Sequence, residues 1–230
     1  MKKEKVIVIS LGGSIIMPEN PDPIFLDKFK ETLRKHYKTH KFVIVCGGGS
    51  IARKYISALE KEGKSKMELS LAGIRATRMN ALFMMQFFGK EANESLPLDM
   101  QHVKNKLEKH PVVFCGALRF EKDSTSDGTA AKLANYLNSN FINMTNVPGL
   151  YTADPRKNKD AKLIKNITWK TFDSIISKIK FHAGQHFVLD QQAAKIIKKH
   201  KVKTYIIGKN LNSLNNILKD KKFLGTLIYK

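Results

Sequence analysis

The chain has 230 residues, and its 41 lysines and arginines against 20 aspartates and glutamates give it a formal charge of +21. Hydrophobic residues make up 42% of the chain, which is enough for a sizeable core and excludes an intrinsically disordered protein. No apolar run approaches the roughly 18 residues of a membrane span, which excludes an integral membrane protein. We therefore expect one α/β domain or two closely joined lobes.

The amino terminus and the cysteines indicate where the protein works. Lysines precede the apolar stretch 6–16 as in a signal peptide, but a glycine pair interrupts the stretch and no small-x-small cleavage site follows. We therefore expect a cytoplasmic protein. Cys46 and Cys115 each end an apolar run and lack metal-type spacing, so we predict reduced, buried thiols.

Short β-branched runs alternate with amphipathic stretches, a pattern typical of a mainly parallel sheet with helices on both faces. In chain order, strands are predicted at Lys5–Ser10, Phe42–Cys46, Val112–Cys115, Phe141–Thr145 and Thr204–Ile207, with an edge strand at Gly225–Tyr229. Helices are predicted between them at Ile24–Lys38, Ile51–Lys61, Leu69–Phe88, Leu98–Lys109, Gly128–Asn138, Trp169–Ile179 and Asp190–His200. No linker or internal repeat divides these elements, so we expect one continuous sheet.

Glycine-rich turns directly follow three of the predicted strands. These turns are Gly12–Ser14, Gly47–Ser50 and Gly116. The carboxyl ends of parallel strands share one edge of a sheet, and glycines let backbone N–H groups approach an anion closely. Two such turns at one edge favour a phosphate-rich ligand, although tight turns alone would also need glycine.

Familiar phosphate-binding motifs do not account for these turns. Gly63–Ser65 matches the end of a Walker A loop, but Ala58 occupies its first glycine position and a helix precedes it. Gly47–Ala52 satisfies the dinucleotide fingerprint, but Glu68, near the expected acidic position, follows no strand. The protein-kinase set of glycine loop, catalytic aspartate loop and Asp-Phe-Gly is absent.

A longer set of segments accounts for more of the chain. The most specific is Thr-Asn-Val-Pro-Gly-Leu-Tyr-Thr-Ala-Asp-Pro at 145–155, and the others lie at 6–14, 18–21, 43–55, 73–81 and 189–197. Together they resemble the amino acid kinase superfamily and, more narrowly, its archaeal type of uridylate (UMP) kinase. The resemblance spans nearly the full length of the chain.

The resemblance implies a three-layer αβα sandwich with a mainly parallel central sheet, built as a single domain from residues 1–230. Residues 1–140 would form the acceptor-binding lobe and residues 141–230 the ATP-binding lobe. The implied reaction transfers the γ-phosphoryl group of ATP to UMP and gives UDP in pyrimidine nucleotide biosynthesis, with Mg²⁺ accompanying ATP. The implied partners are ATP, UMP and further copies of the chain, arranged as a hexamer that is built from dimers.

The resemblance also assigns roles to individual residues. The implied catalytic residues are Gly12, Gly13, Ser14, Arg53 and Asp127. The implied ATP-binding residues are Gly13, Ser14, Gly49, Arg53, Thr145, Asn146, Tyr151 and Asp154. The implied UMP-binding residues are Gly48, Ser70, Gly116, Thr125 and Ser126, and no residue is assigned to a metal.

The residues by themselves also allow purely structural interpretations. Thr125–Asp127 is typical of a helix N-cap cluster, and Asp190 of the cap of another helix. Arg53, placed on the first helical turn after Gly47–Gly49, suits an oxyanion but also suits a solvated helix surface. Three polar residues of the long predicted helix suit either a subunit interface or the acceptor pocket: Thr77, Arg78 and Asn80.

Four features depart from the family pattern. Ser10 stands where many superfamily members carry a lysine that neutralises the phosphoryl group. Ser70 stands where an acidic residue usually contacts the acceptor ribose, with Glu68 near enough to compensate. The loop Gly116–Asp123 is bulkier and more charged than the usual glycine-rich acceptor loop, and Pro148 replaces an aspartate. These departures concern the acceptor and the phosphoryl group more than the fold.

Other functions stay open as alternatives. A catalytically weak nucleotide-binding homologue is motivated by Ser10, Ser70 and the altered loop. A basic nucleic-acid-binding protein is motivated by the charge of +21, but the basic residues are spread over nearly every helix without interleaved aromatics, so we prefer a solvated surface. Isopentenyl phosphate kinases place a histidine shortly after the triple-glycine turn, where Ile51–Lys54 has none, and the acceptor signatures of carboxylate kinases are absent. We therefore expect UMP as the acceptor.

Overall fold

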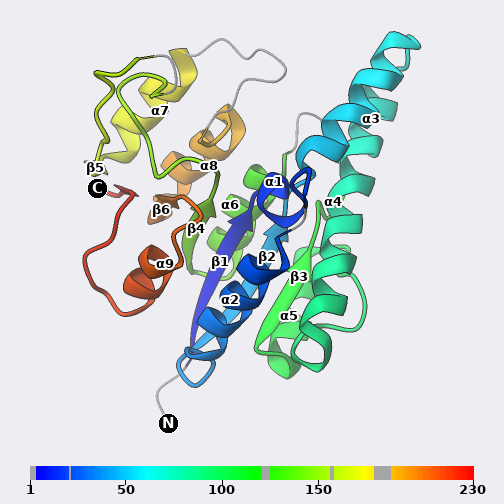
Figure 1. Cartoon of the computed structure of the whole chain (residues 1–230), viewed down its shortest axis with the longest axis horizontal. Coiled ribbons are helices and arrows are strands. Elements are labelled where there is room, and N and C mark those ends of the chain that lie inside the picture. The colour runs from blue at the N-terminus through cyan, green and yellow to red at the C-terminus, as the bar shows by residue number, and fades with distance from the viewer. Residues whose placement is uncertain (1–3, 21, 121–124, 156–157, 179–187) are drawn as a thin grey trace.

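The computed structural model describes residues 4–20, 22–120, 125–155, 158–178 and 188–230 (Figure 1). Its centre is a seven-stranded sheet in the order β3-β2-β1-β4-β6-β7-β5. The strands are β1 (Lys5–Leu11), β2 (His40–Cys46), β3 (Val112–Cys115), β4 (Asn140–Met144), β5 (Asn166–Ile167), β6 (Thr204–Ile207) and β7 (Thr226–Ile228). Neighbouring strands are parallel except β6 and β7, so β7 and β5 run against the rest.

Helices cover both faces of this sheet (Figure 1). They are α1 (Gly13–Ile16), α2 (Pro23–Arg34), α3 (Gly49–Lys61), α4 (Lys66–Phe88), α5 (Met100–Lys109), α6 (Ser126–Tyr136), α7 (Trp169–Lys178), α8 (Gln191–His200) and α9 (Leu211–Leu218), with a 3₁₀ turn, η1, at Gly89–Glu91.

Two hydrophobic clusters fill the space between the sheet and its helices. Alternate strand residues point to opposite faces, so Ile7 and Ile9 join the first cluster while Val8 joins the second. Helices α2, α4 and α9 pack into the first cluster, and α5, α6, α7 and α8 into the second. The expected three-layer αβα sandwich with a mainly parallel sheet is therefore confirmed. In the described part of the chain, no helix is both long and apolar enough to cross a bilayer.

The predicted strands are present within two residues of their predicted ends, but some helix boundaries differ. Helix α2 ends at Arg34 and not at Lys38, because the chain turns back there: the N–H of Thr39 donates to the carbonyl of His36 at 2.9 Å. Helix α4 begins three residues early, because Ser65 and Glu68 form a reciprocal capping box. Residue 179, the last of the predicted helix Trp169–Ile179, lies outside the described residues.

Four of the described elements were not predicted from the sequence: α1, α9, β5 and the 3₁₀ turn η1. Helix α9 has a sequence rich in asparagine, which lowers helix propensity. Its helical state comes from the cap at Asn210, whose side chain accepts from the N–H groups of Asn212 and Ser213, and from its apolar face. Leu214 and Ile217 on that face are buried in the first cluster. Tertiary packing therefore decides this helix.

The two cysteines lie on adjacent strands but on opposite faces of the sheet. Cys46 packs into the first cluster and Cys115 into the second, and both are free thiols that are fully buried. Burial raises the pKa of Cys115 to about 12 and also raises the pKa of Cys46. The prediction of buried, reduced thiols is confirmed.

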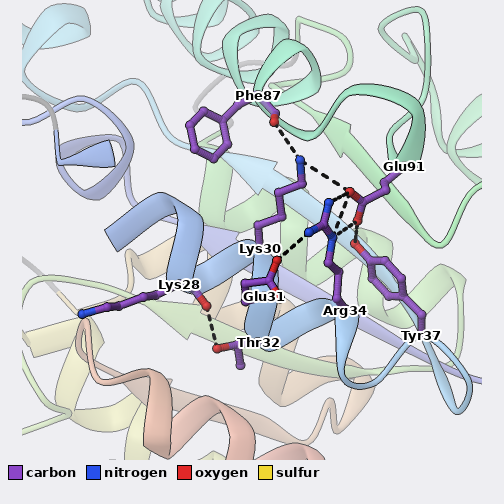
Figure 2. A network of polar contacts seen from close by, with 8 residues as sticks. All are labelled: Lys28, Lys30, Glu31, Thr32, Arg34, Tyr37, Phe87 and Glu91. Carbon is purple, nitrogen blue, oxygen red and sulfur yellow. Dashed lines mark hydrogen bonds and ion pairs between the residues drawn. The ribbon is translucent and has the colours of Figure 1, made fainter. Parts of the chain in front are cut away.

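A polar network around Glu91 joins α2 to the end of α4 (Figure 2). The Nε of Arg34 donates to both carboxylate oxygens of Glu91, at 3.0 and 2.9 Å, and the hydroxyl of Tyr37 donates to it at 3.0 Å. Lys30 Nζ lies 3.4 Å from the same carboxylate and donates to the carbonyl of Phe87 at 3.0 Å. The network thereby fixes the carboxyl end of α4 against α2.

We expect Glu91→Gln to lower the free energy of unfolding by about 1–2 kcal/mol near neutral pH, because its charge-assisted bonds to Arg34 are weakened. Burial alone would raise the pKa of Glu91, but the hydrogen bonds from Arg34 and Tyr37 outweigh it and hold the pKa below its usual range. The stabilisation is therefore complete above the unfolded pKa of about 4.3 and is lost as the pH falls through the folded value. Urea unfolding of both proteins at neutral and strongly acidic pH measures the difference.

Glu31→Gln is the matched control for this prediction. The side chain of Glu31 is 55% exposed and pairs with Arg34 at the surface, so its loss should cost less than about 0.5 kcal/mol. An equal loss of stability for Glu91→Gln at both pH values would show that packing, and not charge, holds the network together.

Candidate active site

The turns after β1 and β2 lie directly against each other. A Cβ atom on Gly13 would stand 2.2 Å from the backbone nitrogen of Gly49 and 2.5 Å from the carbonyl oxygen of Gly47. Gly49 itself has a φ of +62°, a conformation that side chains disfavour. These two glycines are therefore required by the close approach of two backbones.

Backbone and amide hydrogen bonds hold the two turns in place. The N–H of Gly12 donates to the carbonyl of Met144 at the end of β4, at 3.1 Å. The N–H of Gly47 donates to the carbonyl of Leu11 at 2.9 Å, and its own carbonyl accepts from the buried Nδ2 of Asn80 at 2.7 Å. The carboxyl ends of β1, β2 and β4 are thus tied into one edge with α4.

Helix α4 also positions the turn that follows β3. The hydroxyl oxygen of Thr77 accepts from the N–H of Ala117 at 2.9 Å. The guanidinium of Arg78 donates to the carbonyls of Ala117 and Leu118, at 3.1 and 2.5 Å. Gly116 lies so close to α4 that a Cβ would stand 2.7 Å from the backbone nitrogen of Arg78. Thr77, Arg78 and Asn80 therefore hold glycine turns, a role that the sequence did not indicate.

Asp127 lies in the first turn of α6 and faces β1. Its Oδ1 accepts a hydrogen bond from the hydroxyl of Ser10 at 2.6 Å, and Ser10 is 1% exposed. Burial raises the pKa of Asp127 to about 7, and the negative charge of Asp190 adds to the rise while the bond from Ser10 opposes it. The serine that departs from the family pattern is therefore the direct partner of the predicted catalytic carboxylate.

Thr125 joins the starts of α6 and α8. Its hydroxyl oxygen caps α6 by accepting from the N–H of Gly128 at 2.9 Å, and its O–H donates to Asp190 at 2.5 Å. Asp190 in turn caps α8 by accepting from the N–H of Ala193 at 2.8 Å. Both N-cap interpretations made from the sequence are confirmed. The hydroxyl group of Thr125 is already engaged as donor and acceptor within the chain.

The predicted ATP-binding residues begin at the same sheet edge. Thr145 follows β4, and its N–H donates to the carbonyl of Ile207 in β6 at 2.9 Å. Its hydroxyl donates to the side chain of Asn146 at 3.3 Å. Tyr151 and Asp154 lie further along the connection to β5, where Tyr151 forms a bridge with Leu163. The structure therefore places Thr145 and Asn146 directly after the carboxyl end of β4, and Tyr151 and Asp154 later in the same connection.

Arg53 and Ser70 lie in surroundings that differ from those expected. Helix α3 begins at Gly49, so Arg53 falls after its first turn, and the exposed side chain lines a basic surface depression of about 510 Å³ with Lys54 and Lys61. The expectation of Arg53 on the first turn was wrong because the helix already begins at Gly49, the third glycine of the turn. The hydroxyl of Ser70 donates to the carbonyl of Lys66 at 2.9 Å, within its own helix.

Glu68 was expected to compensate for the missing acidic residue at position 70. Its carboxylate instead accepts from the backbone N–H and the hydroxyl of Ser65, at 2.9 and 2.8 Å, as part of the cap of α4. Residues 121–123 of the altered acceptor loop lie outside the described residues. The other residues predicted for the acceptor lie in the turns after β2 and β3, at Gly48 and Gly116, and at the start of α6, at Thr125 and Ser126.

Similarity to known proteins agrees with this geometry. Residues 5–208 match the sequence pattern of the amino acid kinase family. The chain is 34% identical over 224 residues to the uridylate kinase of Thermococcus onnurineus, a match that covers 96% of this chain and 98% of that relative. The chain belongs to the amino acid kinase family.

Further relatives of this amino acid kinase point to the same group. It is 34% identical over 223 residues to the uridylate kinase of Thermoplasma volcanium, covering 96% of each chain. The crystal structure of uridylate kinase from Archaeoglobus fulgidus matches it with a TM-score of 0.84 at 31% identity, over 96% of this chain and 99% of that one. The resemblance to archaeal-type uridylate kinases inferred from the sequence is confirmed.

We expect Gly13→Ala to lower the free energy of unfolding by more than about 3 kcal/mol, because the added methyl group would overlap the backbone of the second turn. Gly73→Ala is the matched control on α4, where the methyl group would meet a side-chain carbon of Ile56 at 3.5 Å, an ordinary contact. Alanine also favours the helix by about 1 kcal/mol. Thermal unfolding compares the two, and similar midpoints would contradict the backbone contact.

Proposed function

We propose that this chain catalyses transfer of the γ-phosphoryl group of ATP to UMP, giving UDP for pyrimidine nucleotide biosynthesis. The observation that carries the proposal is the contact of the two glycine turns at the carboxyl ends of β1 and β2. This contact places the backbone nitrogens of Gly13, Ser14 and Gly49 near one another, where their N–H groups would hold a phosphoryl group that passes between two nucleotides. Relatives named uridylate kinase, aligned along nearly the whole chain, support UMP as the acceptor.

The proposed chemistry depends on positioning and charge neutralisation, since phosphoryl transfer needs no covalent intermediate. The N–H groups of Gly13 and Ser14 would hold the transferring phosphate, while Gly12, whose own N–H donates to Met144, would shape the turn. Gly48 and Gly49 would lie between donor and acceptor. Arg53 would bind phosphate oxygens by reorienting over the start of α3. Asp127 would organise the site electrostatically from the start of α6.

Mg²⁺ is proposed as the cofactor, bound to the phosphates of ATP. The donors that the two turns present are backbone N–H groups, which bind phosphate oxygens and not metal ions, so they fit a metal carried by the nucleotide. When bound, Mg²⁺ supplies positive charge to the phosphate oxygens. The chain's residues orient those phosphates and donate hydrogen bonds to them.

The two nucleotides are assigned to the two halves of the chain. Residues 141–230, which include Thr145, Asn146, Tyr151 and Asp154, would bind ATP, and residues 1–140, with Gly48 and Gly116, would bind UMP. The formal net charge of +21 would attract both anionic substrates. Nucleotide substrates and free, buried thiols suit a reducing compartment, so we propose a cytoplasmic protein.

We also propose that the chain forms a homo-oligomer, a hexamer by family resemblance. Met79 and Leu82 lie on the outer face of α4 with 65% and 41% of their surface exposed, and their spacing of three residues puts them side by side. Met67, near the start of the same helix, is 56% exposed. A face with several exposed large apolar side chains is typical of a contact between protein chains.

The proposed activity is tested by ADP release from ATP and Mg²⁺ with UMP, CMP, AMP, isopentenyl phosphate or acetylglutamate as acceptor. We expect turnover with UMP, and a loss of about 100-fold or more in kcat for Asp127→Asn, which removes the charge of the buried carboxylate. Asp22→Asn is the matched control, because Asp22 is an exposed cap of α2 that accepts from the N–H of Phe25. Saturable ATP binding without turnover of any acceptor would contradict the proposal and favour a nucleotide-binding homologue.

The proposed oligomer is tested by sedimentation of the double variant Met79→Glu, Leu82→Glu. We expect the variant to shift to a smaller species, because two new charges would have to be desolvated in the interface. Leu224→Glu is the control, since Leu224 is 51% exposed and lies between α9 and β7. A monomeric wild type, or an unchanged assembly in the double variant, would rule out this face of α4.

A further inference from the structure

Two carboxylates at the starts of α6 and α8 each accept a hydrogen bond from a different hydroxyl group. Asp127 accepts from Ser10 of β1 at 2.6 Å, and Asp190 accepts from Thr125 at 2.5 Å. Helices α6 and α8 pack against each other, and the negative charge of Asp190 acts on Asp127. Two separate hydrogen bonds therefore hold the two carboxylates, one from β1 and one from the cap of α6, at the starts of two helices that pack together.

We propose that Asp190 is a positioning residue, whose fixed negative charge acts on Asp127 across the packed starts of α6 and α8, in opposition to Ser10. The inference rests on the proposed kinase function, in which Asp127 works as a carboxylate. Asp190 has a fixed place because its two oxygens are held separately, one by the hydroxyl of Thr125 and the other by the N–H of Ala193. A fixed charge near a buried carboxylate raises the proton affinity of that carboxylate.

The two neighbours of Asp127 act with opposite signs. The charge of Asp190 disfavours a second negative charge nearby, whereas the hydrogen bond donated by Ser10 favours the charged form. Of the elements that pack against α6, which are β1, β2, β4 and α8, the described groups that act on Asp127 are Ser10 and Asp190. Burial and Asp190 together place the titration of Asp127 near neutral pH. Activity should therefore fall as the pH drops through neutrality.

The substitutions that separate charge from structure are conservative. Asp190→Asn removes the charge but keeps an oxygen that can accept from Thr125 and cap α8, because asparagine caps helices as well as aspartate does. Ser10→Ala removes the hydrogen bond to Asp127 and leaves the strand residue small and buried. Asp22→Asn, at the exposed cap of α2, applies the same chemical change at a distance from the pair.

The test compares the pH dependence of kcat for ATP and UMP in the wild type and the three variants. We expect the acidic limb to move down by about one pH unit in Asp190→Asn and up by a similar amount in Ser10→Ala. Asp22→Asn should leave the limb where it is. A merely structural role for Asp190 would lower kcat at every pH without moving the limb, and this result would overturn the proposal, as would shifts of the same sign in both variants.

A second measurement keeps the proposal separate from the proposed function. Carbon NMR of the aspartate carboxyl groups follows the titration of Asp127 directly, with its signal assigned from Asp127→Asn. We expect the same opposite shifts in Asp190→Asn and Ser10→Ala whether or not the protein phosphorylates UMP. Absence of UMP turnover with these shifts present would reject the proposed function alone. An Asp127 signal that titrates identically in all the proteins would reject the coupling itself.

Discussion

The contact between Gly13 and Gly49 is the constraint on which the site depends. Parallel pairing of β1 with β2 brings their following turns to the same height, and the absence of both side chains lets the two backbones touch. The hydrogen bond from Gly12 to Met144 ties the end of β4 to the same point. Backbone nitrogens of both turns therefore lie at this contact, and the parallel register of β1 and β2 sets how far apart the two turns lie.

The surroundings of Asp127 link the chemistry of the site to its stability. Ser10 supplies one hydrogen bond and no charge, so it offsets only part of the rise that burial causes in the pKa of Asp127. A folded pKa raised above the unfolded value means that the native state binds the proton more tightly, so this group makes stability fall as the pH rises from about 4 to about 7. The buried carboxylate of Asp127 therefore lowers the free energy of unfolding at neutral pH relative to acidic pH.

The sequence predicted those features that are set by nearby residues. β-branched runs located the strands, and the glycines at their carboxyl ends located the turns, because both signals are local. The roles of Thr77, Arg78 and Asn80 could not be predicted, since each acts on a turn at least 30 residues away in the chain. The cap role of Glu68 was not predicted, although its partner Ser65 lies only three residues earlier in the chain.

Polar side chains of α4 act either on the helix itself or on the turn after β3. Ser70 donates to its own helix and Glu68 caps it, so both side chains already have partners within α4. Thr77 and Arg78 instead form hydrogen bonds with the backbone of Ala117 and Leu118. A shift of α4, such as an assembly contact at its outer face would impose, would move this turn directly. Helix α4 therefore connects the proposed assembly face, with Met79 and Leu82, to the turn that carries Gly116.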